Sequence, residues 1–468
     1  MKPVPHPYLL CASLALAPVA SLAAPLDLPP RPGAFWLKLD TLPAPAPAAG
    51  DPHAVLHFGS LAALTEHALR ERPESRAAWL GAQAEAARLD SAEAANWPTL
   101  TGQINFTQSR ALSSSGASVP TLHRYGPSLS LGYVLVDFGA RAAGIEAQRY
   151  QLIASLLNGN RTLQDVVAEV EAAYFTLLAA RSMVDALAQQ EAALGASLDA
   201  VEARLRGGLA SRADQLRARA AWAEAQLARQ TAERDRAKAE AALKQSAGIA
   251  QTRTLALDWE TVPPGGPDAA MLLADLLDEA GRQRPDLQAL QAAAASARAT
   301  AERARAARWP SLSLSANTGR TFFLEDERVP STTYSVGVNL ALPLFDGGRL
   351  AAEARAAERD AERLQAEAEA QHSLVARTVV EAYLDVHHAQ SQREGIAVQF
   401  ASADESARAA EARYTAGVGS LLEWLTAQAD LARARQARAQ ADSDWLAAFS
   451  RLNHALGRLP VAVSERHP

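Results

Sequence analysis

The strongest constraint on the fold is an internal repeat, because one unit of the sequence is written twice at a spacing of about 210 residues. Arg72-Pro73 recurs as Arg284-Pro285, and Trp97-Pro98 recurs as Trp309-Pro310. Further matches in the same order are Gly139 with Gly347, Tyr174 with Tyr383, Arg204 with Arg413, Gly208 with Gly417, Ser211 with Ser420, and Gly248 with Gly457. We therefore predict two copies of one unit, residues 60–250 and 271–458, with a linker at 251–270 and a tail at 459–468.

Each copy begins with a helical stretch, residues 61–97 and 272–309, which is rich in Ala, Glu and Arg and ends at a Trp-Pro pair. The apolar period then changes to two, which predicts β-hairpins at 99–137 and 311–346. The alternating apolar residues are Leu100, Ile104, Phe106, Leu129, Leu131, Tyr133 and Leu135, and then Leu312, Leu314, Tyr334, Val336, Val338 and Leu340. The polar loops near Ser113–His123 and Glu325–Thr332 are expected to be exposed tips.

A very long helix is predicted after each hairpin, from residue 140 to about 206 and from 349 to about 415, since neither stretch contains proline. At about 1.5 Å per residue, such a helix is on the order of 100 Å long. Glycines interrupt both helices, and a shorter helical stretch follows to Gly248 or Gly457. The two shorter helices of a copy together have about the length of the long helix. Each copy is therefore expected to be a β-hairpin attached to two parallel helical rods, one formed by the long helix and the other by the two shorter helices end to end.

The N-terminus resembles a cleavable signal peptide, residues 1–23, with an apolar stretch that is too short for a membrane anchor. The one cysteine, Cys11, lies inside it, so no disulfide or cysteine metal site is expected in the exported chain. A Pro- and Ala-rich leader, 24–59, should be extended. The formal net charge of -6 comes from mixed acids and bases, which argues against a nucleic-acid partner.

Membrane insertion, if it occurs, must use the hairpins, because no later segment has the 18 or more apolar residues of a membrane helix. Four strands cannot close a barrel alone, so several chains are needed, and two or three chains give even strand numbers. The helices would continue the ring as a tube. The alternative is a plain coiled coil or helical bundle, namely a periplasmic adaptor or scaffold without a barrel.

Enzymatic and metal-binding roles find little support in the sequence. His387-His388 and His372 lie on a helical stretch without the carboxylate spacing of a helical zinc site. No phosphate-binding loop or nucleophile motif stands in a suitable context. We therefore expect no catalytic residue, no metal and no cofactor.

Residues 60–458 resemble the TolC-like outer membrane efflux family. The resemblance is carried by both Trp-Pro joints, by Leu344-Phe345-Asp346-Gly347-Gly348 and by Arg413-Tyr414-Thr415-Ala416-Gly417. It implies a mainly α protein with a membrane β-barrel, in which a homotrimer forms a twelve-stranded barrel in outer-membrane lipid and a periplasmic α-helical tunnel. It also implies a periplasmic adaptor protein and an inner-membrane pump as partners, and passive passage of drugs, metals or secreted polypeptides.

The resemblance assigns roles to the glycine turns. It makes adaptor contacts of Gly208, Leu209, Ala210 and Ser211, and of Gly417, Val418, Gly419 and Ser420. Simple helix-breaking turns are the alternative. At the channel entrance it places an acidic ring at Glu423, whereas Thr426 replaces a second acid, and a closing network at Asp214 and Tyr414. Gly419 stands where an arginine completes that network in the family, and a solvated surface charge is the alternative for Glu423.

Overall fold

The computed structural model describes residues 55–110, 121–258, 272–324 and 330–458. The predicted signal peptide, residues 24–54 of the leader, residues 259–270 of the linker, the predicted loop tips at 111–120 and 325–329 and the tail lie outside the described residues. The chain divides into two units, Met1–Asp51 and Pro52–Pro468, and all described residues belong to the second.

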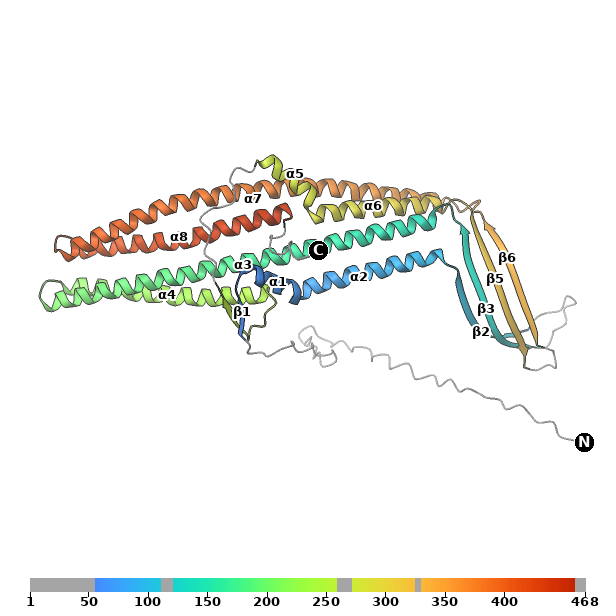
Figure 1. Cartoon of the computed structure of the whole chain (residues 1–468), viewed down its shortest axis with the longest axis horizontal. Coiled ribbons are helices and arrows are strands. Elements are labelled where there is room, and N and C mark those ends of the chain that lie inside the picture. The colour runs from blue at the N-terminus through green and yellow to red at the C-terminus, as the bar shows by residue number, and fades with distance from the viewer. Residues whose placement is uncertain (1–54, 111–120, 259–271, 325–329, 459–468) are drawn as a thin grey trace, which may run out of the picture. The chain divides into compact units, whose positions relative to one another are not determined.

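Two helices, a β-hairpin and two further helices follow one another in this order twice within the second unit (Figure 1), and β1, η2 and β4 occur in the first copy alone among the described residues. The first copy comprises β1 (Val55–Phe58), α1 (Leu61–Glu71), α2 (Pro73–Glu93), the 3-10 turn η2 (Ala94–Asn96), β2 (Thr99–Ser109), β3 (Leu122–Val136), α3 (Ala140–Arg206), α4 (Arg212–Ser246) and β4 (Thr254–Leu257). The second comprises α5 (Leu273–Gln283), α6 (Pro285–Ala306), β5 (Ser311–Phe323), β6 (Ser331–Ala341), α7 (Arg349–Thr415) and α8 (Leu421–Leu456). The prediction of two copies, each with a hairpin and long helices, is confirmed.

The two long helices, α3 and α7, have 67 residues each and form the axis of their copies. Both α2 and α4 pack along α3, while α6 and α8 pack along α7 (Figure 1). Helices α6 and α8 also contact α3, so the two copies are joined along their length. Many of the buried residues are alanines, such as Ala218, Ala225, Ala232 and Ala239 of α4. These repeat every seven residues and allow close approach of the helix axes.

The first helical stretch of each copy is broken, whereas the sequence pattern predicted it as continuous. The break falls at Arg72 and Arg284, whose backbones are extended (ψ 134° and 119°), and Pro73 and Pro285 begin the next helices. Proline disfavours an α conformation in the residue before it, yet fits the first helical position well. The Arg-Pro pair therefore ends one helix and begins another.

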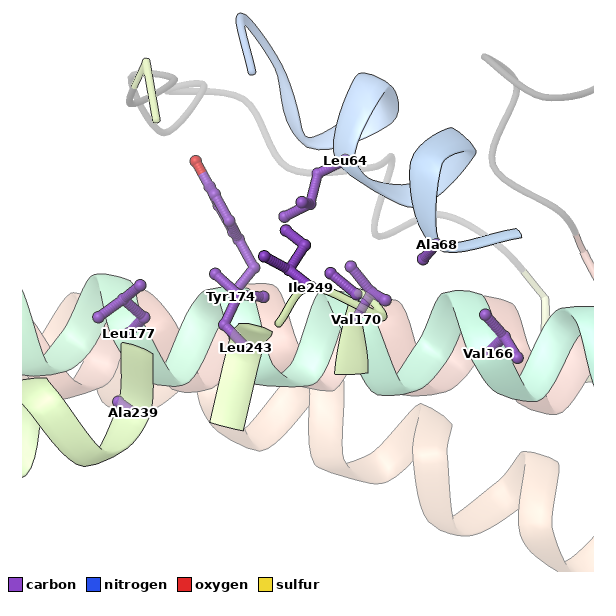
Figure 2. Close-up of a cluster of buried hydrophobic side chains, with 10 residues drawn as sticks. Leu64, Ala68, Val166, Val170, Tyr174, Leu177, Ala239, Leu243 and Ile249 are labelled. Carbon is purple, nitrogen blue, oxygen red and sulfur yellow. The ribbon is translucent and has the colours of Figure 1, made fainter. Parts of the chain in front are cut away.

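A two-stranded parallel sheet, which the sequence pattern did not predict, joins β1 to β4 with Val55 opposite Thr254 and Phe58 opposite Leu257. Beneath it lies a buried cluster from α1, α3, α4 and the segment after α4, formed by Leu64, Ala68, Val166, Val170, Tyr174, Leu177, Ala239, Leu243, Ala247 and Ile249 (Figure 2). The second copy has a matching cluster that includes Leu276, Ala280, Val379 and Leu452. These two clusters hold the helix ends together midway along the long helices.

The four hairpin strands form one antiparallel sheet in the order β2-β3-β5-β6. Residues that face each other across the strands share a side, so Leu100, Leu131, Ala316 and Val336 lie on one face. Ser130, Asn317 and Ser335 lie on the other. One face is therefore apolar and the other polar, and β2 and β6 are the open edges within the described residues.

Among the helices of the described ranges, none combines the length and the hydropathy needed to cross a lipid bilayer.

Candidate functional site at the helical turns

The α3–α4 and α7–α8 turns lie together at the end of the helices farthest from the sheet (Figure 1). Gly208 and Gly417 adopt positive φ angles of 74° and 79°, which explains glycine at both positions. Leu209 and Val418 stand next to them and are 81% and 69% exposed. Each turn thus presents one apolar side chain to solvent.

Serines cap the helices that leave the turns. The Ser211 Oγ accepts a bond from the Asp214 backbone N–H at 3.1 Å, and the Asp214 carboxylate accepts bonds from the Ser211 N–H (3.1 Å) and Oγ–H (2.7 Å). These hydrogen bonds from Ser211 lower the pKa of the Asp214 carboxyl. Asp214 is therefore ionised at neutral pH and stabilises the start of α4.

The matching residues of the second turn divide their roles differently. Ser420 Oγ accepts a bond from the Glu423 N–H at 3.1 Å, but the Glu423 carboxylate pairs with Arg413 at 3.3 Å. Thr426 is exposed one turn further along α8 and donates its hydroxyl to the Leu422 carbonyl at 2.8 Å. Arg413 of the same chain therefore partly neutralises Glu423, so the pair produces a weaker negative potential at a distance than an unpaired carboxylate would.

Four helices meet in a packed cluster at these turns, which we call the tip cluster. It contains Val201, Ala218, Ala407, Ala410, Tyr414, Leu421, Trp424, Ala427 and Leu431. The Tyr414 ring stacks on Trp424 with centroids 5.0 Å apart. Ala210 packs against the cluster from the first turn. The described chain therefore holds its two helical hairpins together at the tip.

Arg204, in the last turn of α3, links the two copies. Its Nη2 donates to the carbonyl oxygens of Tyr414 and Thr415, both at 3.0 Å, and its guanidinium lies 4.3 Å from the centroid of the Tyr414 ring. The carbonyls at a helix C-terminus lack partners within the helix and carry partial negative charge. Arg204 therefore satisfies the end of α7 with a cation from α3.

The two predicted closing residues have different partners. Asp214 contacts Ser211 and Arg217, whereas Tyr414 contacts Arg204 and Trp424. A Cβ at Gly419 would lie 3.0 Å from Arg413 Cβ and from the Tyr414 nitrogen, so the turn is too tight for a larger residue without a shift. Arg204 was not singled out from sequence, although a basic residue in the last helical turn, repeated as Arg413, was a visible signal.

The described residues contain no group of three or more His, Cys, Asp or Glu side chains arranged to hold a metal ion. His387 packs edge-on against the Tyr383 ring, with centroids 4.4 Å apart. This contact accounts for one of the histidines that the sequence brought to attention.

Comparisons with known proteins agree with this architecture. The family described as "Outer membrane efflux protein" matches residues 64–249 and 276–458. The chain is 30% identical to "Protein CyaE" of Bordetella pertussis over 374 residues, which cover 79% of this chain and 78% of CyaE. It is 24% identical to "Outer membrane protein TolC" of Escherichia coli, over 68% of this chain and 65% of TolC.

The fold is also that of a solved outer-membrane channel. The structure of OprN superimposes with a TM-score of 0.74 at 23% sequence identity, over 85% of this chain and 89% of OprN. From the two matched repeats and the shared fold, the chain belongs to the outer membrane efflux protein family, as an outer-membrane channel with a periplasmic helical tunnel.

Proposed function

We propose that three copies of this chain close their sheets into one twelve-stranded barrel and their helices into one tunnel, through which cargo passes without chemical change. The observation that supports this most directly is the open sheet. Every described residue of β6 is exposed, and β2 and β6 each pair on one side only within the described residues. Unpaired strand edges are not tolerated in lipid, where water cannot satisfy the backbone.

Three chains are the favoured number because they give twelve strands, an even number typical of bacterial barrels. The internal repeat supports this geometry, since two similar hairpins per chain make six similar positions around the ring. The alternative of an adaptor or scaffold without a barrel is not favoured, because the relatives of this chain are outer-membrane channels.

The tunnel entrance is proposed to lie at the helical turns, where a periplasmic adaptor linked to an inner-membrane pump would dock. Exposed apolar side chains at both turns, Leu209 and Val418, support a contact with another protein. Asp214, Ser211 and Ser420 serve mainly to cap helices in this proposal, and Gly208, Gly417 and Gly419 shape the turns. Drugs, metals and secreted polypeptides are the cargo classes of such channels.

The first experiment is the mass of the detergent-extracted particle from the outer-membrane fraction. A trimer supports the proposed channel, whereas a soluble monomer in the periplasm contradicts a barrel. Disulfide trapping can then test closure directly, since Cys11, in the predicted signal, is the only cysteine of the sequence. Chains carrying Gln103→Cys on β2 together with Ser335→Cys, Gly337→Cys or Asn339→Cys on β6 should give covalent trimers at one register, and failure at every register contradicts closure.

Docking at the turns is tested by placing a charge on the apolar tip. Val418→Glu should abolish export by an assembled channel, because a carboxylate in an apolar contact loses its hydration. Gly417 is a poorer site, since its φ of 79° would strain any larger residue. Val398→Glu on α7 is the matched control, because Val398 is also 69% exposed. Normal export by the Val418 variant would argue against docking there.

A further inference from the structure

Near the loop end of the sheet, the cationic side chain of Arg320 lies among aromatic rings on the apolar face. Tyr125 faces Phe322 across the β3–β5 pair, and their rings stack with centroids 5.3 Å apart. Tyr334 faces Thr318 across the β5–β6 pair and is 84% exposed. Arg320 lies between these residues on β5. We call Phe106, Tyr125, Arg320, Phe322 and Tyr334 the loop-end girdle.

Arg320 points to the apolar face. Along β5, residues 312, 314, 316, 318, 320 and 322 share one side, and the Arg320 guanidinium lies 5.3 Å from the Phe322 ring centroid. The side chain is exposed, and no salt bridge is found for it within the described residues. Thr332 faces Arg320 across the β5–β6 pair and Thr318 shares its side of β5, but neither carries a charge. The cation therefore needs an anionic partner or water.

The position of Arg320 along the strand matches a membrane interface. Trp309, 63% exposed, marks the helix end of the sheet, and Ser311 to Arg320 is nine steps along the strand, or about 30 Å. A strand tilted by about 40° advances roughly 23 Å along the barrel axis, close to the apolar band of about 25 Å. With Trp309 at the periplasmic interface, Arg320 stands at the outer one, because the tunnel helices are periplasmic.

Aromatic residues at a membrane interface sit at the level of lipid headgroups. Phosphate is the anionic group that all phospholipids carry at this level, and phosphorylated glycolipids carry it as well. The planar guanidinium binds phosphate with two parallel hydrogen bonds, and it is less strongly hydrated than an ammonium. The charge of Arg320, the shape of its guanidinium and its position along the strand therefore all favour a lipid phosphate as the ligand.

We infer that Arg320 and the loop-end girdle form a binding site for the phosphate group of an outer-leaflet lipid. The inference rests on the proposed barrel, with its apolar face toward lipid. The aromatic rings would pack on the upper acyl chains and sugar while Arg320 binds the phosphate. Closure of three chains would repeat the site three times around the barrel.

The sheet offers a matched control on its opposite face. Arg124 is adjacent to Tyr125 on β3 and is also exposed, but it faces the polar side, where its Nη2 donates to Ser109 Oγ at 3.2 Å. Arg124→Gln and Arg320→Gln remove the same charge from opposite faces of the loop end of the sheet, where Arg124 lies opposite Phe323, three residues beyond Arg320. Only the second change should affect a lipid bound on the apolar face.

The experiment is native mass spectrometry of the full detergent-solubilised channel titrated with lipid A, in parallel with its enzymatically dephosphorylated form. The wild type should retain the phosphorylated lipid in preference. Arg320→Gln should weaken that retention about fivefold or more and remove the preference. Arg124→Gln should behave as the wild type. Arg320→Lys should retain part of the preference, since lysine keeps the positive charge but lacks the two parallel N–H donors of the guanidinium.

Three results would overturn the inference: equal retention of both lipid forms by the wild type, unchanged retention by Arg320→Gln, or a loss caused by Arg124→Gln instead. The second result is expected if Arg320 pairs with Glu325, Asp326 or Glu327, which lie outside the described residues. The same spectra report the mass of the particle. A trimer without phosphate preference refutes only the lipid site, whereas a monomer refutes the barrel as well.

Discussion

Replacing Arg204 by methionine should open the channel entrance. Arg204 connects α3 to the last carbonyls of α7, and methionine keeps a long apolar side chain while it removes the charge and all donors. We propose that opening of the entrance separates the end of α3 from the end of α7, so that the contacts of Arg204 exist only in the closed entrance. Their loss destabilises the closed state selectively.

The magnitude follows from the contacts. Two charge-assisted hydrogen bonds at 3.0 Å and a ring contact at 4.3 Å are lost. Hydrogen bonds to charged groups contribute about 1.5–3 kcal/mol and an exposed cation–π contact about 0.5–1 kcal/mol. Because the site is partly exposed and water replaces the donors, we take about 1–2 kcal/mol per chain. If three chains open together, the closed-to-open ratio falls by about 10² to 10⁴.

Single-channel recording in planar bilayers measures this ratio as the open probability. The expected result is longer and more frequent openings of the Arg204→Met channel, at unchanged particle mass. Arg206→Met is the matched control, because Arg206 lies in the same helical turn and is exposed, and no contact of its side chain is found within the described residues. Equal open probability for the wild type and both variants would refute the role of Arg204 in closure.

Three further predictions concern the entrance and the helix ends. Glu423→Ala should reduce cation preference in bilayer recordings, and Arg413→Gln should increase it, because Arg413 pairs with Glu423 at 3.3 Å. Gly457→Ala should destabilise the protein by about 1–2 kcal/mol, seen as a lower thermal midpoint, since φ is 79° and the new Cβ would lie 3.1 Å from Arg284 Cα. Burial lowers the pKa of His454, so the unfolded chain binds the imidazole proton more tightly and the free energy of unfolding should fall as the pH drops below about 6.5. His454→Asn should make this fall smaller, as measured by urea unfolding at several pH values.

Each of these has a control within the chain. The Glu423 and Arg413 changes should act in opposite directions, so shifts of the same sign would contradict a local charge effect. Gly395→Ala meets open space within a helix and should stabilise the protein slightly, by about 0.5–1 kcal/mol. The contribution of neutral His454 to the free energy of unfolding should be fully present above about pH 6.5 and should be lost as the pH falls toward the lowered pKa of the folded state. A steeper loss of stability in the asparagine variant would contradict this reasoning.

Local patterns explain how the sequence predicted so much of the fold. The 67 residues of α3 contain no proline, and the alternation of Leu100, Ile104 and Phe106 appears unchanged on one sheet face. The Arg72-Pro73 bend was visible as a dipeptide but not as a break, since proline also fits a helix start. The four residues of β1 were missed because their partner, β4, lies about 200 residues away and no local turn joins them.

At the entrance, too, some features follow from the local sequence and others from tertiary packing. The sequence by itself determined the turns at Gly208 and Gly417 and the helix caps, because positive φ and Ser-x-x-Asp capping are properties of a few consecutive residues. Only the tertiary structure decided that Arg204 binds the end of α7 whereas its repeat partner Arg413 pairs with Glu423. A long flexible side chain takes whichever acceptor the packing of distant helices brings within reach, and two equivalent arginines in one repeat therefore acquire different roles.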